Sequence, residues 1–203
     1  PGREALWAAA LEAERAAHAH PSGVDPAIVA WGRPIVFDRA GDTPRVRPQR
    51  FAAPLYVLAG WCGSHGGTRA TVSGLATLRE RRPKLVTSAM DTLAEAARTG
   101  SRALRAGELE ALGPAMDLAH GVLSGLGLVG DEVEAAVRAA RRAGALGAKM
   151  SGAGGVGGAW LAAFADRGRA RRAASRLRAD GHAIVEEALG ADSRAREASR
   201  ATT

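Results

Sequence analysis

The sequence has few aromatic residues and a single cysteine, and each shortage excludes a class of protein. Aromatic side chains make up 4% of the 203 residues, which disfavours a β-sandwich and favours close-packed helices rich in Ala, Leu and Val. The one cysteine, Cys62, excludes an intramolecular disulfide framework. It is compatible with a reducing compartment, so we expect a cytoplasmic protein.

Long hydrophobic runs are also absent. The apolar stretch at residues 51–63 is short and interrupted by glycine, so it is unsuited to spanning a bilayer. We therefore expect no membrane partner. The overall hydrophobic content of 46% is nevertheless sufficient for a chain of this length to bury a core.

Lysine is nearly missing, although the formal net charge is +7. The positive charge is almost all arginine, with lysine only at Lys84 and Lys149. The arginine clusters at residues 167–178 and 194–200 contain almost no aromatic side chains that could stack on bases. We therefore expect no nucleic-acid partner despite the basic composition.

Hydrophobic periodicity predicts helices that alternate with a few short strands. The helices are expected at residues 4–17, from Asp25 onward, and at 68–80, 84–98, 108–124, 131–142 and 169–179. The strands are expected at 34–37, 55–59, 147–150, 159–164 and 182–185, with a surface connection at 39–50. Asp25 and Asp131 are predicted helix caps, and Pro26 the first helical residue. Helices segregated from a small, mainly antiparallel sheet indicate an α+β fold.

A glycine-rich segment at residues 149–158 is the most conspicuous local feature. Five of the seven residues from Gly152 to Gly158 are glycine. Such a loop lets backbone N–H groups converge on an anion. It matches neither a Walker loop nor a complete dinucleotide fingerprint. The residues alone leave two interpretations open, an anion-binding loop and a tight glycine hairpin at a crowded packing site.

Two carboxylates flank the turn between the first two predicted helices. Glu14 lies on the first helix, and Asp25 follows eleven positions later, after Pro21-Ser22-Gly23. One carboxylate that holds a divalent metal and one that orients or deprotonates a hydroxyl would suit phosphoryl transfer. Alternatively, Asp25 is only a helix cap and Glu14 a solvated residue.

Other polar residues give weaker indications. His18 and His20 have no second pair at zinc-ligand spacing. Ser64 and His65 are neighbours of Cys62 in sequence, which does not make a catalytic triad. Thr68 follows a glycine-rich turn and is either a helix cap or part of an anion site at a helix N-terminus.

These motifs together resemble those of the GHMP-superfamily small-molecule kinases, most closely the mevalonate kinases. Glu14, His18-Ala19-His20 and Pro21-Ser22-Gly23-Val24-Asp25 resemble the segment from the metal-binding Glu through His-Gly-x-Pro-Ser-Gly-x-Asp. Residues 149–158 are similar to the third GHMP motif, Lys-Leu-Thr-Gly-Ala-Gly-Gly-Gly-Gly. Gly67-Thr68-Arg69 resembles the family's Ser-Thr-Lys segment.

The resemblance implies a role for each matching residue. Asp25 would be the catalytic carboxylate and Glu14 a Mg²⁺ ligand, with ATP as the phosphoryl donor to the 5-hydroxyl of mevalonate. The substrate would be bound by His20, Ser22, Gly23 and Thr68. The phosphate or nucleotide loop would comprise Ser151, Gly152, Ala153, Gly154, Gly155 and Gly157. The resemblance also implies a homodimer when the enzyme is complete.

The sequence departs from the family at several places. It lacks the nucleotide loop Pro-x-Gly-x-Gly-Leu-Gly-Ser-Ser-Ala and the amino-terminal lysine that pairs with the catalytic aspartate. Pro26, Gly66 and Val156 replace residues usual in relatives. The alternatives are therefore another GHMP enzyme (phosphomevalonate kinase, diphosphomevalonate decarboxylase or a sugar kinase) and a non-catalytic remnant of the fold.

The resemblance also implies a domain organisation. Residues 1–50 would be the end of the GHMP amino-terminal domain, and residues 51–190 the carboxyl-terminal domain with a ferredoxin-like sheet. The polar segment at 191–203 is expected to be a disordered tail.

Overall fold

The computed structural model describes residues 2–17, 22–39, 44–63, 68–152, 154–155 and 157–190. His20, Ala153 and the predicted tail at 191–203 lie outside the described residues. The chain divides into two compact units, Pro1–Arg50 and Phe51–Thr203.

The first unit is a helical pair with a small hairpin. It contains helices α1 (Arg3–Ala17) and α2 (Val24–Trp31) and the antiparallel strands β1 (Ile35–Asp38) and β2 (Arg45–Pro48). The Trp7 ring on α1 packs edge-on against Trp31, at a centroid distance of 5.8 Å, and against Phe37, at 6.3 Å. This aromatic cluster joins α1, α2 and β1.

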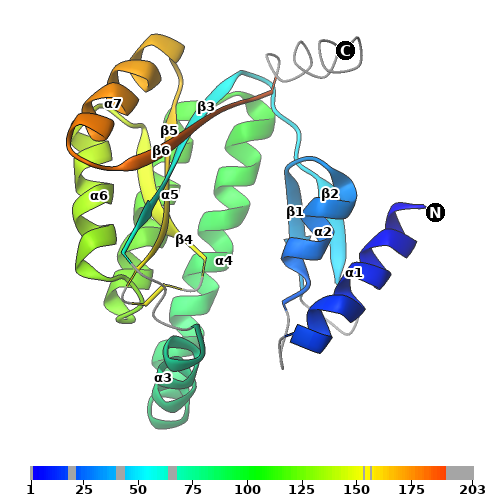
Figure 1. Ribbon diagram of the computed structural model, residues 1–203. Helices are drawn as coiled ribbons and strands as arrows, with labels where there is room; N and C mark the ends of the chain where they lie inside the picture. Colours follow the sequence, from blue (N-terminus) through cyan, green and yellow to red (C-terminus); the bar gives the residue numbers. More distant parts are fainter. Residues whose placement is uncertain are drawn as a thin grey trace. The chain divides into compact units, whose positions relative to one another are not determined.

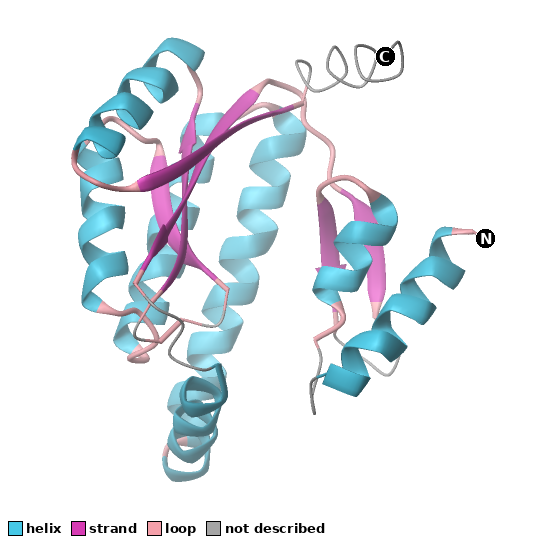
Figure 2. Ribbon diagram, in the orientation of Figure 1, coloured by secondary structure: helices cyan, strands magenta, loops and turns pink. Residues whose placement is uncertain are grey.

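The second unit contains a four-stranded antiparallel sheet (Figures 1 and 2). Its strands are β3 (Leu55–Cys62), β4 (Gly147–Ser151), β5 (Gly158–Phe164) and β6 (Ala183–Leu189), in the order β4-β5-β3-β6. Helices follow the first and third strands, so the connectivity is the β-α-β-β-α-β pattern of ferredoxin-like folds. The predicted α+β fold is confirmed.

Five helices accompany this sheet. They are α3 (Thr68–Arg81), α4 (Pro83–Ala106), α5 (Leu109–Gly125), α6 (Asp131–Arg142) and α7 (Arg167–Ala179). None of the helices in the described part of the chain is both long and apolar enough to cross a membrane.

The core lies on both faces of the sheet. Successive side chains of a strand point to opposite faces. Leu58 of β3 belongs to a cluster with Trp160 of β5, Val137 of α6 and Leu177 of α7, all fully or almost fully buried. Leu55, three residues earlier on β3, belongs to a second cluster. That cluster contains residues from the end of α4 and the start of α5, among them Ala103, Leu109 and Leu112.

Helix α5 approaches strand β4 at a pair of glycines. A Cβ atom added at Gly113 would lie 2.0 Å from the carbonyl oxygen of Leu146, and one added at Gly147 would lie 2.4 Å from the carbonyl oxygen of Gly113. Both distances are far below van der Waals contact. The two backbones can therefore lie this close only because neither residue has a side chain.

The structure corrects several predicted elements. The segment 39–50 contains a strand, β2, and is not only a surface connection. Helix α4 continues through Gly100 to Ala106. One glycine costs a helix only about 1 kcal/mol, and the packing of α4 on α5 can offset that cost. Gly100 lies against Leu112 of α5, whose Cδ1 would be 3.3 Å from an added Cβ. The predicted cap at Asp131 is also wrong, since Gly130 is the N-cap of α6 and Asp131 the first helical residue.

Candidate functional site

In the first unit, one face of α1 meets the start of α2. The indole Nε1 of Trp7 donates a hydrogen bond to the carbonyl oxygen of Gly23, at 3.1 Å. A Cβ added at Gly23 would be 3.4 Å from Cδ1 of Leu11. Trp7, Leu11 and Glu14 are spaced four and three residues apart, so they share one face of the helix. Glu14 therefore lies on the face of α1 that contacts Gly23.

The turn before α2 is shaped by Ser22 and Gly23. Gly23 is the N-cap residue in the left-handed conformation, with φ 79°, which favours glycine. The Ser22 hydroxyl oxygen accepts a hydrogen bond from the N–H of Val24, at 3.3 Å. The predicted cap at Asp25 is thus wrong: the N-cap is Gly23, and Asp25 lies in the first turn of the helix. Its carboxylate is exposed, at the helix end where the dipole stabilises negative charge.

Glu14 has an unusual environment for a helix carboxylate. Its Oε2 atom is buried and has no hydrogen-bond partner among the described residues. Burying a carboxylate oxygen without a partner costs free energy, and a bound cation would remove that cost. No group of three or more His, Cys, Asp or Glu side chains in the described residues is arranged to hold a metal ion. Glu14 could therefore contribute one ligand of a cation that other groups share.

In the second unit, the glycine-rich loop connects β4 to β5. Gly152, Gly154 and Gly155 have φ values of 83°, 76° and 111°, in the region that favours glycine. The N–H of Gly155 donates a hydrogen bond to the carbonyl oxygen of Leu128, at 3.0 Å. A Cβ added at Gly154 would lie 2.0 Å from the same oxygen, whereas one added at Gly152 would meet nothing within 4 Å. The loop is therefore crowded at Gly154 and open at Gly152.

A second predicted site segment lies beside this loop. Cys62, the last residue of β3, pairs with Gly158, the first residue of β5. An added Cβ at Gly63 would be 3.4 Å from Cα of Gly157 and 2.6 Å from Oε2 of Glu132. The chain that leads toward Thr68, the first residue of α3, thus begins next to the glycine loop. The carboxylate of Glu132, which sequence reasoning did not select, lies at the same place.

Burial changes the pKa values of two nearby side chains. Lys149, on β4 just before the loop, has a lowered pKa because burial disfavours its ammonium form. Burial raises the pKa of the Cys62 thiol, and the carboxylate of Glu132 acts in the same direction. Cys62 is therefore held as a buried, neutral thiol, which does not suit a nucleophile.

A polar cluster supports β4 from the helices behind it. Asp117 Oδ1 on α5 accepts hydrogen bonds from the backbone N–H of Ala148, at 3.0 Å, and from Nε of Arg141, at 2.9 Å. Nδ1 of the buried His120 accepts one from the N–H of Met150, at 3.2 Å. These contacts were not predicted from the sequence. In the sequence, the only indication of these contacts is that the polar residues Asp117 and His120 are three residues apart, and so on one face, in a helix that also has an apolar face.

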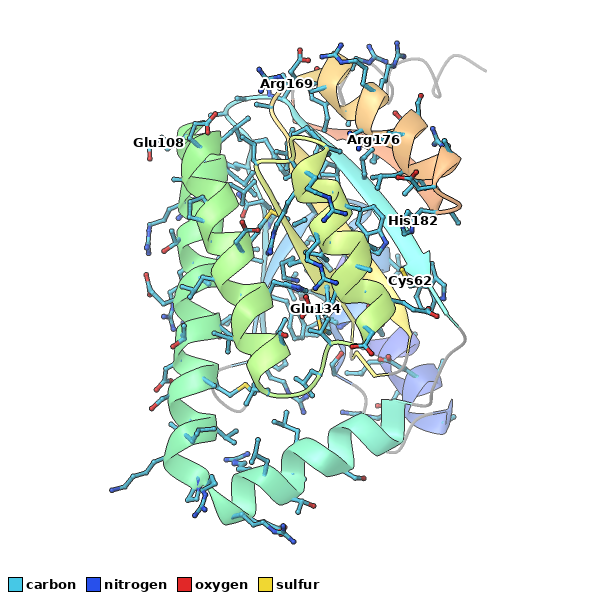
Figure 3. All side chains as sticks on the ribbon, turned by 90° about the vertical axis from the view of Figure 1, so that its left-hand side faces the viewer. Cys62, Glu108, Glu134, Arg169, Arg176 and His182 are labelled. Carbon is cyan, nitrogen blue, oxygen red and sulfur yellow. The ribbon has the colours of Figure 1, made fainter. Side chains whose placement is uncertain are left out.

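The structure thus places the predicted residues in two groups. Glu14, Ser22, Gly23 and Asp25 surround the turn between α1 and α2 in the first unit. The described residues 151–152, 154–155 and 157 lie in the second unit, beside the end of the sheet where β3 ends and β5 begins, and Thr68 begins α3 in the same unit. Figure 3 shows Cys62 at this end of β3.

The sequence was compared with known families and proteins. Residues 101–183 match the family described as GHMP kinases C terminal. The mevalonate kinase of Aeropyrum pernix is 34% identical over 151 residues, which are 74% of this chain and 46% of that protein. The mevalonate kinase of Methanothermobacter thermautotrophicus is 33% identical over 158 residues, which are 77% of this chain and 50% of that protein. The chain therefore spans about half the length of these relatives.

Solved structures share the fold. The L. major mevalonate kinase in complex with R-mevalonate matches with a TM-score of 0.78 and 26% identity, covering 85% of this chain and 54% of that chain. The Streptococcus pneumoniae phosphomevalonate kinase in complex with phosphomevalonate and AMPPNP matches with a TM-score of 0.66 and 19% identity. That match covers 83% of this chain and 56% of the solved chain, and at this identity it concerns the fold alone.

Proposed function

We propose that this chain, which contains the carboxyl-terminal domain of the GHMP kinases, is part of a mevalonate kinase. The complete enzyme would transfer the γ-phosphoryl group of ATP to the 5-hydroxyl of mevalonate. The observation that carries the proposal is the agreement between the sequence relatives, which are mevalonate kinases, and the motif around Asp25. We further propose a cytoplasmic enzyme that is a homodimer when complete.

We assign the role of orienting or deprotonating the substrate hydroxyl to Asp25. Its carboxylate is exposed at the start of α2, where Gly23 is the N-cap and no described side chain caps the helix. It is therefore available to accept a hydrogen bond from a hydroxyl group. Gly23, held by Trp7, fixes the turn on which Asp25 is mounted. His20, Ser22 and Gly23 would contact the substrate from the same turn.

We assign Glu14 to Mg²⁺. The buried Oε2 atom without a partner fits a cation ligand, because a carboxylate oxygen is a preferred donor for Mg²⁺. When bound, Mg²⁺ neutralises charge on the phosphates of ATP. Glu14 would hold the ion on the face of α1 that contacts Gly23, close in the fold to the turn that carries Asp25.

The glycine loop is assigned to the phosphates. At Gly152 the loop is open, and its positive φ would let the backbone there turn an N–H group toward an anion. At Gly154 and Gly155 the loop is packed on Leu128, which fixes its shape. Ser151, the last residue of β4, leads into this loop, and Ala153 is assigned to the phosphates from its place in the sequence motif. Thr68 would add a contact at the start of α3, where a helix N-terminus favours an anion.

The test is a substrate panel with ATP and Mg²⁺. The chain and a form extended by the coding sequence upstream would be assayed for ADP release with mevalonate, phosphomevalonate, diphosphomevalonate and galactose. We expect turnover with mevalonate in the extended form. Turnover only with another acceptor would reassign the substrate within the family. A lack of turnover in every form, from folded protein, would favour a non-catalytic member.

The Glu14→Gln variant is expected to need more Mg²⁺. Removing the charged ligand should raise the Mg²⁺ concentration for half-maximal turnover by at least about tenfold. Without divalent ions its stability should not fall, because an amide is less costly to bury than a carboxylate. The measurement is a Mg²⁺ titration of turnover at saturating ATP, with a thermal unfolding curve of the metal-free protein.

The matched control is Glu12→Gln on the same helix. Glu12 is exposed and pairs with Arg15, three residues away. Its replacement removes the same charge from α1 without touching the buried oxygen. If both variants show the same Mg²⁺ dependence as the unaltered protein, Glu14 is not a ligand.

A further inference from the structure

Among the described strands, β4, which leads into the glycine loop, has a neighbour on one side. Its neighbour is β5, and the pairing runs from Gly147 with Ala163 to Ser151 with Ala159. In an antiparallel pair, the backbone groups of alternate residues point away from the partner strand. The outward-pointing groups of β4 bind side chains instead.

Two outward positions of β4 are bound by helix side chains. At Ala148, the N–H donates to Asp117 Oδ1 at 3.0 Å, and the carbonyl oxygen accepts from Arg141 Nη2 at 2.9 Å. At Met150, the N–H donates to Nδ1 of His120 at 3.2 Å. Asp117 and His120 are three residues apart on α5, while their partners are two residues apart on β4. Side chains one turn apart on α5 can therefore bind successive outward-pointing residues of β4.

The hydrogen bond at Met150 determines the state of the His120 ring. Nδ1 can accept from an N–H group only with a free lone pair, so the ring proton is on Nε2. Nε2 lies 3.2 Å from Oε2 of Glu134, to which it donates. Glu134 points from α6 toward α5 (Figure 3). A hydrogen bond from the Ser124 hydroxyl, and to a lesser extent the His120 ring, lowers the pKa of Glu134, which keeps it a charged acceptor.

The position of Met150 matters for the loop. It is the last residue before Ser151 and Gly152, and its Cε atom would lie 3.0 Å from a Cβ added at Gly154. The loop has a second attachment at Gly155, whose N–H donates to Leu128 in the connection between α5 and α6. His120 and Leu128 thus hold the two sides of the loop on the same helical hairpin. The open part at Gly152 lies between these two attachments.

We propose that His120 is a positioning residue for phosphoryl transfer. As the Nε2–H tautomer oriented by Glu134, it holds the N–H of Met150 and thereby sets where the glycine loop presents its backbone to the phosphates. The proposal rests on the proposed function, because the loop is assigned to the phosphates there. His120 itself is 3% exposed, so we expect it to act through the loop and not by contact with the reacting groups.

The test compares His120→Asn with His120→Leu. The Asn oxygen branches from Cγ as Nδ1 does, so it can still accept from Met150, whereas Leu has a similar branch and no acceptor. We expect the Met150 amide to exchange with solvent about tenfold faster in the Leu variant, since one hydrogen bond is lost. The Asn variant should stay within about threefold of the unaltered chain. The matched control is His182→Leu. The His182 ring lies against Trp160 of β5, whereas His120 binds β4.

A ¹⁵N NMR spectrum of the His120 ring shows which ring nitrogen carries the proton. A histidine with a purely structural role need not be protonated on Nε2. We expect a protonated Nε2 and an unprotonated Nδ1 in the unaltered chain. A ring protonated on Nδ1 overturns the proposal, as does equal exchange of the Met150 amide in the Asn and Leu variants. If the Leu variant does not fold while the Asn variant does, the acceptor is required and the proposal is supported. Failure of both variants to fold would overturn it.

Kinetics separate this proposal from the proposed function. In a form that turns over mevalonate, the Leu variant should lose about tenfold in kcat, with KM for mevalonate nearly unchanged and kcat largely restored in the Asn variant. An unchanged kcat in the Leu variant would refute the positioning role and leave the kinase assignment standing. Turnover with no substrate would refute the kinase assignment, while the ring spectrum and amide exchange would still report on His120.

Discussion

Replacing Asp25 with asparagine is expected to lower kcat for mevalonate phosphorylation by about 10²–10⁴-fold, the usual contribution of a positioned acid or base. An amide cannot take the proton of the substrate hydroxyl, although it keeps the size of the carboxylate. KM for mevalonate should change little, because Ser22 and Gly23 still shape the turn. The measurement is steady-state turnover in a form that is active before the substitution.

The stability of the protein should change little in the Asp25→Asn variant. The carboxylate is exposed and makes no capping hydrogen bond, so the substitution removes only its interaction with the dipole of α2. Asp91→Asn on α4 is a matched control, since Asp91 is exposed and the charge change is the same. An Asp25→Asn variant as active as this control would refute the catalytic role.

Replacing Gly113 with alanine is expected to destabilise the second unit by about 2–4 kcal/mol. The added Cβ would lie 2.0 Å from the carbonyl oxygen of Leu146, so the backbone of α5 or of the chain entering β4 must move. A flexible side chain could turn away, but a backbone carbonyl at the start of a strand cannot. The measurement is urea unfolding followed by circular dichroism.

Gly121→Ala is the control for this prediction. Gly121 is on the same helix, is exposed, and an added Cβ there would meet nothing within 4 Å. Alanine is favoured over glycine in a helix, so this variant should be more stable by about 0.5–1 kcal/mol. Equal unfolding midpoints for the two variants would show that α5 and β4 do not approach each other as described.

Segments with a dense periodic pattern could be predicted from the sequence. Helix α6 begins and ends where its pattern of alanine, valine and charge predicts, from Asp131 to Arg142. The strands on either side of the glycine loop were also predicted, because the loop itself marks where one ends and the next begins. These signals are local, and the packing of the unit agrees with them.

Other elements depend on contacts that the local sequence does not contain. Gly100 weakens a helix by its own preference, but α4 continues because it packs along α5, where Leu112 lies against this glycine. Strand β2 is four residues long and carries two arginines and a proline, so only its pairing with β1 makes it a strand.

Only part of the candidate site could be predicted from the sequence. Glu14, Asp25 and the glycine loop were selected because their types and order fit phosphoryl transfer. The burial of Glu14 Oε2 could not be predicted, since it depends on how α1 packs. His120 and Glu134 are ordinary polar helix residues fourteen positions apart, and their link to Met150 exists only in the folded unit.

The helix side chains bound to β4 also affect how the sheet meets other molecules. A sheet whose outermost backbone groups are free can add a strand from another chain, which is a common route to aggregation. At one margin Asp117 and Arg141 bind the N–H and the carbonyl oxygen of Ala148, and His120 and Lys149 bind those of Met150. At the other, Arg178 of α7 donates to the carbonyl oxygen of Ile184 on β6, at 3.0 Å. The same contacts that shape the unit therefore hinder a second chain from extending its sheet.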